Sequence, residues 1–233
     1  MVAARFAVPV PEGISAVDAA PLTCAGVTTY KALKVAHIVP TERVAVFGIG
    51  GLGHLAVQYG RIMGGSVIAV DIEDAKLDLA RELGAEHVVN AAKVDPVAAI
   101  QELGGADVAL VLAASPRVFE QAFDSLARGG RLVCVALPAD QQMTVSIFDT
   151  VIKGLSIIGS IVGTRQDRRC SPCTPPGARG SSPSRARSSR STRRSTRCCP
   201  VRCSRASCSS TEPLEPQAHG PRPRSRGEAR RFR

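Results

Sequence analysis

A glycine-rich turn is the part of this sequence whose residue types and spacing most directly indicate chemistry. Gly48, Gly50 and Gly53 fit the pattern G-x-G-x-x-G, directly after the apolar run RVAVF and directly before a helical pattern. The first glycine permits a tight turn, the second lets the backbone approach a pyrophosphate, and the third lets helix and strand pack closely. Amide groups at the helix N-terminus attract phosphate. The expected dinucleotide contacts are Gly48, Ile49, Gly50, Gly51, Leu52 and Gly53.

An acidic residue follows at the distance that this chemistry requires. Asp71 ends the next apolar run, 18 residues after Gly53, and the acid that accepts from the adenosine ribose hydroxyls is expected about 20 residues on. A carboxylate there repels the 2′-phosphate of NADP, so the spacing favours NAD. Two other interpretations stay open: the turn can be a strand–helix connection without a ligand, and Asp71 can be a helix N-cap.

Alternating strand-like and helix-like segments must position these residues. Apolar runs rich in β-branched residues, without clean alternation, suit strands covered on both faces. The predicted fold is α/β, a Rossmann doubly wound parallel sheet of six strands. The expected strands are residues 43–48, 66–72, 87–90, 107–114, 130–137 and 155–163, and the expected helices are 53–64, 73–85, 96–105 and 116–130, with residues 6–34 starting irregular and becoming helical.

Several stretches of the sequence resemble one enzyme family. They are APLTCAGVTTYKALK (20–34), VFGIGGLGHLAVQYG (46–60), DIEDAKLDLARELGA (71–85), ARGGRLVCVALP (127–138) and GSIVGTRQD (159–167). Together they are similar to the cofactor domain of medium-chain, zinc-dependent alcohol dehydrogenases of the propanol-preferring bacterial type. The resemblance implies hydride transfer between a primary alcohol and NAD, with NAD and zinc as cofactors and an alcohol or aldehyde as substrate.

The resemblance also implies roles for single residues. Cys24 matches the third protein ligand of the catalytic zinc, although a lone cysteine is more commonly a small buried apolar residue. Thr28 matches a contact near the nicotinamide. Lys76 matches a cation that helps Asp71 hold the adenosine ribose, but by itself it would pass for a solvated helix lysine. The residues that match the strand ends lining the nicotinamide pocket are Val135, Leu137, Ser160 and Val162.

The sequence also departs from the family. We expect residues 1–22 to be the remnant of the end of a GroES-like catalytic domain, residues 23–165 to be the NAD-binding domain, and residues 166–233 to be a disordered tail. A catalytic zinc needs three protein ligands and an open fourth position, and the resemblance supplies one, Cys24. We therefore expect a truncated chain without activity and assign no catalytic residue. The alternative is an inert NAD-binding module.

The tail differs from the body in composition. Residues 1–165 carry a net charge of −3, whereas residues 166–233 contain 17 arginines and carry +13. One choice of GC-rich codons for residues 170–177 and 191–212, moved back by one nucleotide, encodes amphipathic helical strings and then a stop. We therefore expect the chain from about Arg168 to be a frameshift product. Phosphate binding by the arginines and zinc binding by the tail cysteines are the alternatives, and we expect no specific nucleic-acid binding.

The body of the chain, residues 1–165, indicates a cellular location and a partner. It has two cysteines, no signal-like N-terminal segment, and no apolar run near the ~20 residues of a membrane span. These features predict a cytoplasmic protein that does not enter a membrane. The expected last strand, residues 155–163, would lie at the sheet edge, and the resemblance implies that this edge can pair with a second copy of the chain. We expect apolar surface to be exposed by the loss of the helix after this strand and of the catalytic domain, which predicts poor solubility or aggregation.

Overall fold

The computed structural model describes residues 10, 14–140, 142–164 and 166–167. These residues belong to the first of two units into which the chain divides, Met1–Ser182 and Pro183–Arg233. The predictions for the tail from residue 168, including the frameshift and the nucleic-acid alternative, lie outside the described residues, as does most of the expected remnant in residues 1–22.

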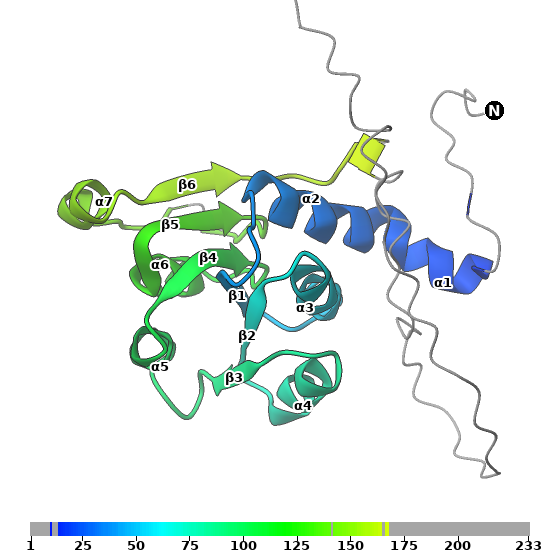
Figure 1. Cartoon of the computed structure of the whole chain (residues 1–233), viewed down its shortest axis with the longest axis horizontal. Coiled ribbons are helices and arrows are strands. Elements are labelled where there is room, and N and C mark those ends of the chain that lie inside the picture. The colour runs from blue at the N-terminus through cyan, green and yellow to red at the C-terminus, as the bar shows by residue number, and fades with distance from the viewer. Residues whose placement is uncertain (1–9, 11–13, 141, 165, 168–233) are drawn as a thin grey trace, which may run out of the picture. The chain divides into compact units, whose positions relative to one another are not determined.

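Six parallel strands form one sheet in the order β3-β2-β1-β4-β5-β6 (Figure 1). This confirms the predicted doubly wound sheet and places β6 at its edge. The strands are β1 (Arg43–Phe47), β2 (Ser66–Asp71), β3 (His87–Asn90), β4 (Ala106–Val111), β5 (Leu126–Cys134) and β6 (Ser156–Gly159).

Helices cover both faces of the sheet and bury two apolar layers (Figure 1). On one face, Leu33, Leu55 and Leu77 pack against Val44 and neighbouring strand residues. This layer is covered by α2 (Val27–Val35), α3 (Gly53–Ile62) and α4 (Asp74–Glu82). The opposite layer is covered by α5 (Pro96–Glu102) and α6 (Pro116–Asp124). Burial on both faces explains why the strands carry apolar runs without alternation.

The N-terminal helical region has three parts. The short helix α1 (Ala16–Pro21) is capped by the hydroxyl of Ser15, which accepts from the Asp18 amide. A π-helical turn, η2 (Leu22–Gly26), follows and leads into α2. The π turn adds one residue to the helical repeat. Leu22 and Ala25 of this turn pack against the apolar layer that α2 and α3 cover.

Two element boundaries differ from the prediction. The helix expected over 116–130 ends at Asp124, and β5 begins at Leu126. Leu126 already pairs with Ala106, and the register then shifts because the next pair is Val108 with Arg131. The intervening residues bulge, and a Cβ at Gly130 would lie 2.8 Å from a backbone oxygen. The two glycines at the end of the helical pattern therefore belong to a bulged strand.

The region around β6 is the second difference. The strand ends at Gly159, so residues 160–163 of the expected strand are irregular. Before it lies α7 (Ile147–Lys153), a helix that was not predicted from the sequence. Ser146 caps this helix by accepting from the Asp149 amide, and Gly154 ends it in the left-handed conformation. Of the helices within the described ranges, none is long and apolar enough to cross a membrane.

Candidate functional site

The glycine-rich turn lies at the junction of β1 and α3, as its spacing predicts. Gly48 has φ +96°, which favours glycine, and a Cβ there would lie 2.9 Å from the Ala113 amide nitrogen. At Gly53, the first residue of α3, a Cβ would lie 2.1 Å from the Gly48 carbonyl oxygen. Both positions therefore have no room for a side chain, because what they touch is backbone.

The middle of the turn is open. Gly50 and Gly51 are exposed, and a Cβ at either would meet nothing within 4 Å. In the part of the chain that the structure describes, no side chain caps α3. Among its first amide groups, that of His54 donates to the Gly50 carbonyl at 3.2 Å, so an anionic ligand would meet the exposed backbone of Gly50 and Gly51 just before the helix. The turn therefore forms a cradle of backbone atoms that is closed at Gly48 and Gly53 and open at Gly50 and Gly51.

Asp71 closes the neighbouring strand and reaches the turn. Its carboxylate accepts from the Ile49 amide at 2.7 Å, and from the Ile72 and Glu73 amides at 2.8 and 3.1 Å. Its side chain is 8 % exposed. The N-cap of α4 is Glu73, so the open interpretation of Asp71 as the cap of that helix is wrong. The carboxylate fixes the turn to the end of β2.

A lysine adds positive charge beside this carboxylate. Lys76 Nζ lies 3.8 Å from Asp71 Oδ1 and 2.8 Å from Glu73 Oε1. The hydrogen bond with Glu73 raises the pKa of the Lys76 ammonium above its usual value. The lysine therefore stays charged at neutral pH. It lies next to Asp71, the predicted ribose acceptor.

The residues expected around the nicotinamide come from three segments. Thr28 on α2 is buried, and its hydroxyl donates to the Cys24 carbonyl at 2.7 Å. Val135 follows β5 and is partly buried against the α2 layer, whereas Leu137 is 84 % exposed. After β6, Ser160 is buried and its amide donates to the Cys134 carbonyl at 2.9 Å.

Two features of the segment after β6 are unusual. The Ser160 hydroxyl is buried without a hydrogen-bond partner among the described residues, and a buried polar group of that kind calls for a ligand or a water. Val162 has φ +43°, which is rare for a β-branched residue. Strained backbone and unpaired polar groups concentrate at binding sites. The geometry therefore fits a bound dinucleotide along the carboxyl edge of the sheet.

The described residues do not form a zinc site. Cys24 lies on the π-helical turn, is exposed and forms no disulfide. Within the described ranges, no group of three or more His, Cys, Asp or Glu residues could hold a metal ion. A catalytic zinc needs three protein ligands. Cys24 remains a predicted single ligand.

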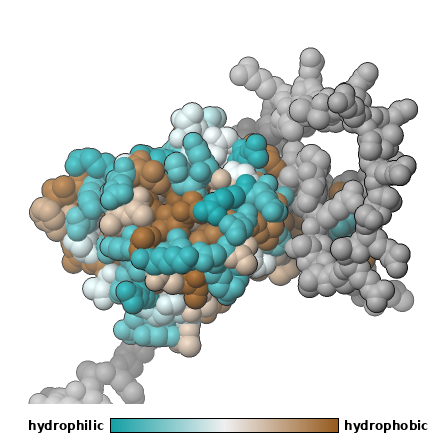
Figure 2. All heavy atoms as spheres, turned by 90° about the horizontal axis from the view of Figure 1, so that it is seen from below, coloured by the Kyte–Doolittle hydropathy of each residue, from teal (hydrophilic) through white to brown (hydrophobic). Residues whose placement is uncertain are grey.

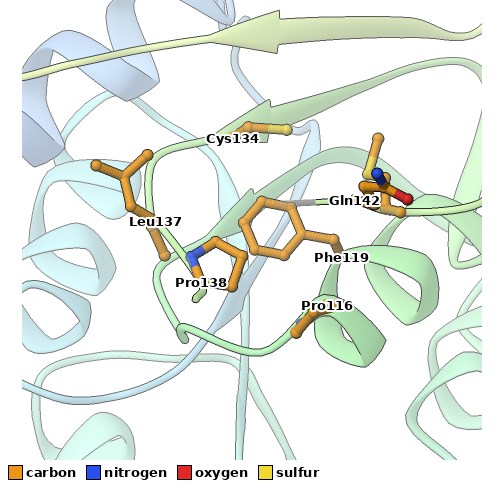
Figure 3. Close-up of a pocket in the computed structure, with 8 residues that line it drawn as sticks. Pro116, Phe119, Cys134, Leu137, Pro138 and Gln142 are labelled. Carbon is orange, nitrogen blue, oxygen red and sulfur yellow. The ribbon is translucent and has the colours of Figure 1, made fainter. Parts of the chain in front are cut away.

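A pocket of about 480 Å³ lies at the carboxyl end of β5, and most of its residues were not predicted from the sequence. In Figure 3 the ring of Phe119 lies between Pro138 and Gln142. Burial raises the pKa of the Cys134 thiol, so the thiol stays protonated. The pocket therefore offers apolar surface without an ionised nucleophile. Its lining residues are Pro116, Phe119, Cys134, Ala136, Leu137, Pro138, Gln142 and Met143.

Comparison with known proteins agrees with this geometry. Residues 51–171 match the model of the zinc-binding dehydrogenase family. An alcohol dehydrogenase of Geobacillus stearothermophilus is 51% identical over 165 residues, which are 70% of this chain and 48% of the relative. The chain thus spans about half the length of the curated relatives it matches.

Solved structures share the fold over the same region. The alcohol dehydrogenase of Aeropyrum pernix has a TM-score of 0.64 and 36% identity, covering 70% of this chain and 49% of that one. An acetophenone reductase of Geotrichum candidum in complex with NAD has a TM-score of 0.62 at 28% identity. It covers 70% of this chain and 46% of the reductase. A putative zinc-binding dehydrogenase of Sinorhizobium meliloti bound to NADP has a TM-score of 0.67 at 27% identity. It covers 72% of this chain and 51% of the relative. The chain has the glycine-rich turn, an aspartate at the end of β2 and a parallel sheet, and it belongs to the zinc-binding dehydrogenase family.

Proposed function

We propose that the described domain binds NAD and is the cofactor half of an alcohol dehydrogenase. The observation that carries this proposal is the Asp71 carboxylate, tied to the Ile49 amide at 2.7 Å beside the open backbone of Gly50 and Gly51. The turn would take the pyrophosphate, while Asp71 and Lys76 would take the adenosine ribose. NAD is favoured over NADP because the carboxylate repels a 2′-phosphate.

The nicotinamide end would lie between α2 and the segments that follow β5 and β6. The residues that would line it are Thr28, Val135, Leu137, Ser160 and Val162. Cys24 lies one helical turn before Thr28. Bound NAD would supply the hydride acceptor with which the whole enzyme would oxidise a primary alcohol to an aldehyde, with release of a proton. The proposed residues hold and orient the cofactor for that transfer.

NADH binding is the direct test of this proposal. The full chain should enhance and shift the fluorescence of NADH in a saturable titration. Added NAD should compete with NADH for the same site. NADPH should bind at least tenfold more weakly, which corresponds to about 1.4 kcal/mol. Absence of saturable NADH binding by a chain that melts cooperatively would overturn the proposal.

The alternative function, an NAD-binding module without turnover, is favoured by the surroundings of Cys24. Cys24 has no neighbouring metal ligands among the described residues. We expect purified chain with ethanol, NAD and zinc to form no more NADH than a Cys24→Ala variant, measured at 340 nm. Turnover clearly above that variant would show that this chain assembles a working zinc site.

We also propose that the apolar edge, here meaning Ile147, Phe148, Val151, Ile152, Ile157 and Ile161, pairs with a second copy of the chain. All six residues are at least 45 % exposed, and β6 is the outermost strand beside α7. Figure 2 shows hydrophobic residues gathered at the end of the molecule where Figure 1 places α7. An unpaired strand edge with apolar neighbours favours association.

Sedimentation tests this pairing. The full chain should sediment as a dimer or larger assembly, and Phe148→Asp should shift it toward the monomer. Val94→Asp changes another exposed apolar residue, away from the edge, and should leave the assembly unchanged. A wild-type chain that is monomeric at tens of micromolar would contradict the proposal.

The free thiols of Cys24 and Cys134 support the further proposal of a cytoplasmic location.

A further inference from the structure

The segment after β6 lies against α2, although about 130 residues separate them in the sequence (Figure 1). The Lys31 ammonium donates to the Ile161 carbonyl at 3.1 Å. At Gly163, a Cβ would lie 2.3 Å from Val27 Cγ2 and 2.9 Å from the Val27 carbonyl oxygen. The backbone of Gly163 therefore touches α2 directly, which only glycine permits.

A buried carboxylate completes this contact. Asp167 Oδ1 lies 3.0 Å from Lys34 Nζ on α2, and the Asp167 side chain is 7 % exposed. Its other oxygen accepts from the Thr164 amide at 2.8 Å and from the Thr164 hydroxyl at 2.7 Å. The Asp167 amide lies 3.4 Å from the same hydroxyl, which completes a reciprocal capping arrangement. One carboxylate thus ties the segment both to itself and to α2.

The charge of this carboxylate is maintained. Burial by itself would raise the pKa of Asp167, but the hydrogen bonds from Thr164 and Lys34 outweigh it and hold the pKa below its usual value. Hydrogen bonds between ionised partners are about twice as strong as neutral ones. We call these four residues the α2 clasp: Lys31, Lys34, Thr164 and Asp167.

The clasp brackets the strained residue. Val162, with φ +43°, lies between the Lys31 contact at residue 161 and the Thr164–Asp167 contact. A left-handed valine persists only where its surroundings over-determine it. Ser160, whose buried hydroxyl has no partner among the described residues, begins the same segment. The clasp therefore holds in place the two residues expected to line the nicotinamide.

We propose that the α2 clasp positions the Ser160–Val162 segment for the nicotinamide half of NAD. The inference rests on the proposed function. The adenosine half would instead be held by the glycine turn after β1 and by Asp71 at the end of β2, whereas the clasp contacts described above join α2 to the segment after β6. Lys31, Lys34, Thr164 and Asp167 are positioning residues, since they would act through the segment they hold. The two halves of the cofactor should therefore respond differently when the clasp is broken.

Comparing NADH with ADP-ribose, which lacks the nicotinamide ring, tests this inference in the full chain by calorimetry. Asp167→Asn keeps the size of the side chain and removes its charge. We expect the Kd for NADH to rise about tenfold and the Kd for ADP-ribose to stay within twofold. Asp149→Asn, which breaks the exposed Lys153–Asp149 pair on α7, should change neither value. Lys34→Met should reproduce the effect of Asp167→Asn.

The outcomes separate the two proposals. If wild-type chain binds neither ligand, the proposed function fails and the clasp inference fails with it. If wild-type chain binds both and Asp167→Asn weakens both equally or neither, only the clasp inference fails. Hydrogen–deuterium exchange provides a readout without ligand: exchange should become faster in residues 160–164 of Asp167→Asn and remain unchanged in α3. Unchanged exchange in residues 160–164 would also overturn the inference.

Discussion

Replacing Gly53 with alanine is expected to abolish NADH binding and to lower the free energy of unfolding by about 1–3 kcal/mol, the usual cost of forcing extra atoms into a packed site. The added Cβ would lie 2.1 Å from the Gly48 carbonyl oxygen and 2.9 Å from its carbon. These atoms are backbone at the start of the turn, so no side-chain rotation relieves the contact. The N-terminus of α3 must move away from β1, which opens the phosphate cradle.

Gly51→Ala is the matched control for this prediction. A Cβ at Gly51 meets nothing within 4 Å, and its φ lies outside the left-handed region. The free energy of unfolding should therefore change by no more than about 0.5 kcal/mol. The methyl group would still occupy the open side of the cradle, so NADH binding should weaken at least tenfold. Urea unfolding and NADH titration of both variants measure the two effects. Equal destabilisation of the two variants, or NADH binding by Gly53→Ala, would contradict this account.

The sheet was predictable because its strands report their environment in sequence. A strand covered on both faces must be apolar at successive positions, as in VAVF of β1 and VIAV of β2. Glycine and proline mark the ends of the helices between them. A parallel sheet built from such units follows from general rules of chain connection. The strand order and the edge position of β6 were therefore predictable from the sequence.

The misplaced elements depend on contacts that are distant in sequence. The bulge between Leu126 and Arg131 exists because Leu126 pairs with Ala106, and no local pattern in LARGG indicates that pairing. The helix α7 is different, since Ser146, Asp149 and Gly154 are ordinary start and stop signals. All of its residues lie outside the buried core, so its apolar residues gave no pattern of burial against the sheet.

The site was predictable where backbone chemistry decides it and not where packing does. The spacing of Gly48, Gly53 and Asp71 follows from the geometry of a strand–turn–helix unit. The Lys34–Asp167 pair joins residues 133 positions apart, and the left-handed Val162 lies just before Gly163, which touches Val27 on α2. The Phe119 pocket likewise needs the loop after β5 folded back onto α6. Such features appear only in three dimensions.

Asp71→Asn is expected to weaken NADH binding by about 10- to 100-fold and to remove most of the preference over NADPH. The carboxylate accepts from the Ile49, Ile72 and Glu73 amides, and hydrogen bonds to a charged group contribute about 1.5–3 kcal/mol. An asparagine has one carbonyl oxygen for these donors, so the turn loses its fixed link to β2. It also carries no charge to repel a 2′-phosphate, and Lys76 can then pair with that phosphate.

The loss of charge at Asp71 can be separated from a general electrostatic change by Asp74→Asn. Asp74 starts α4, pairs with Lys93 at 2.7 Å and accepts from the Asn90 side chain, and both of these partners lie outside the glycine turn. Removing its charge alters the net charge of the domain by the same amount. Calorimetric titration of both variants with NADH and NADPH should show a changed ratio of the two Kd values for Asp71→Asn alone. An unchanged ratio in Asp71→Asn would mean that Asp71 holds the turn but does not select the cofactor, because a carboxylate facing a 2′-phosphate cannot be electrostatically silent.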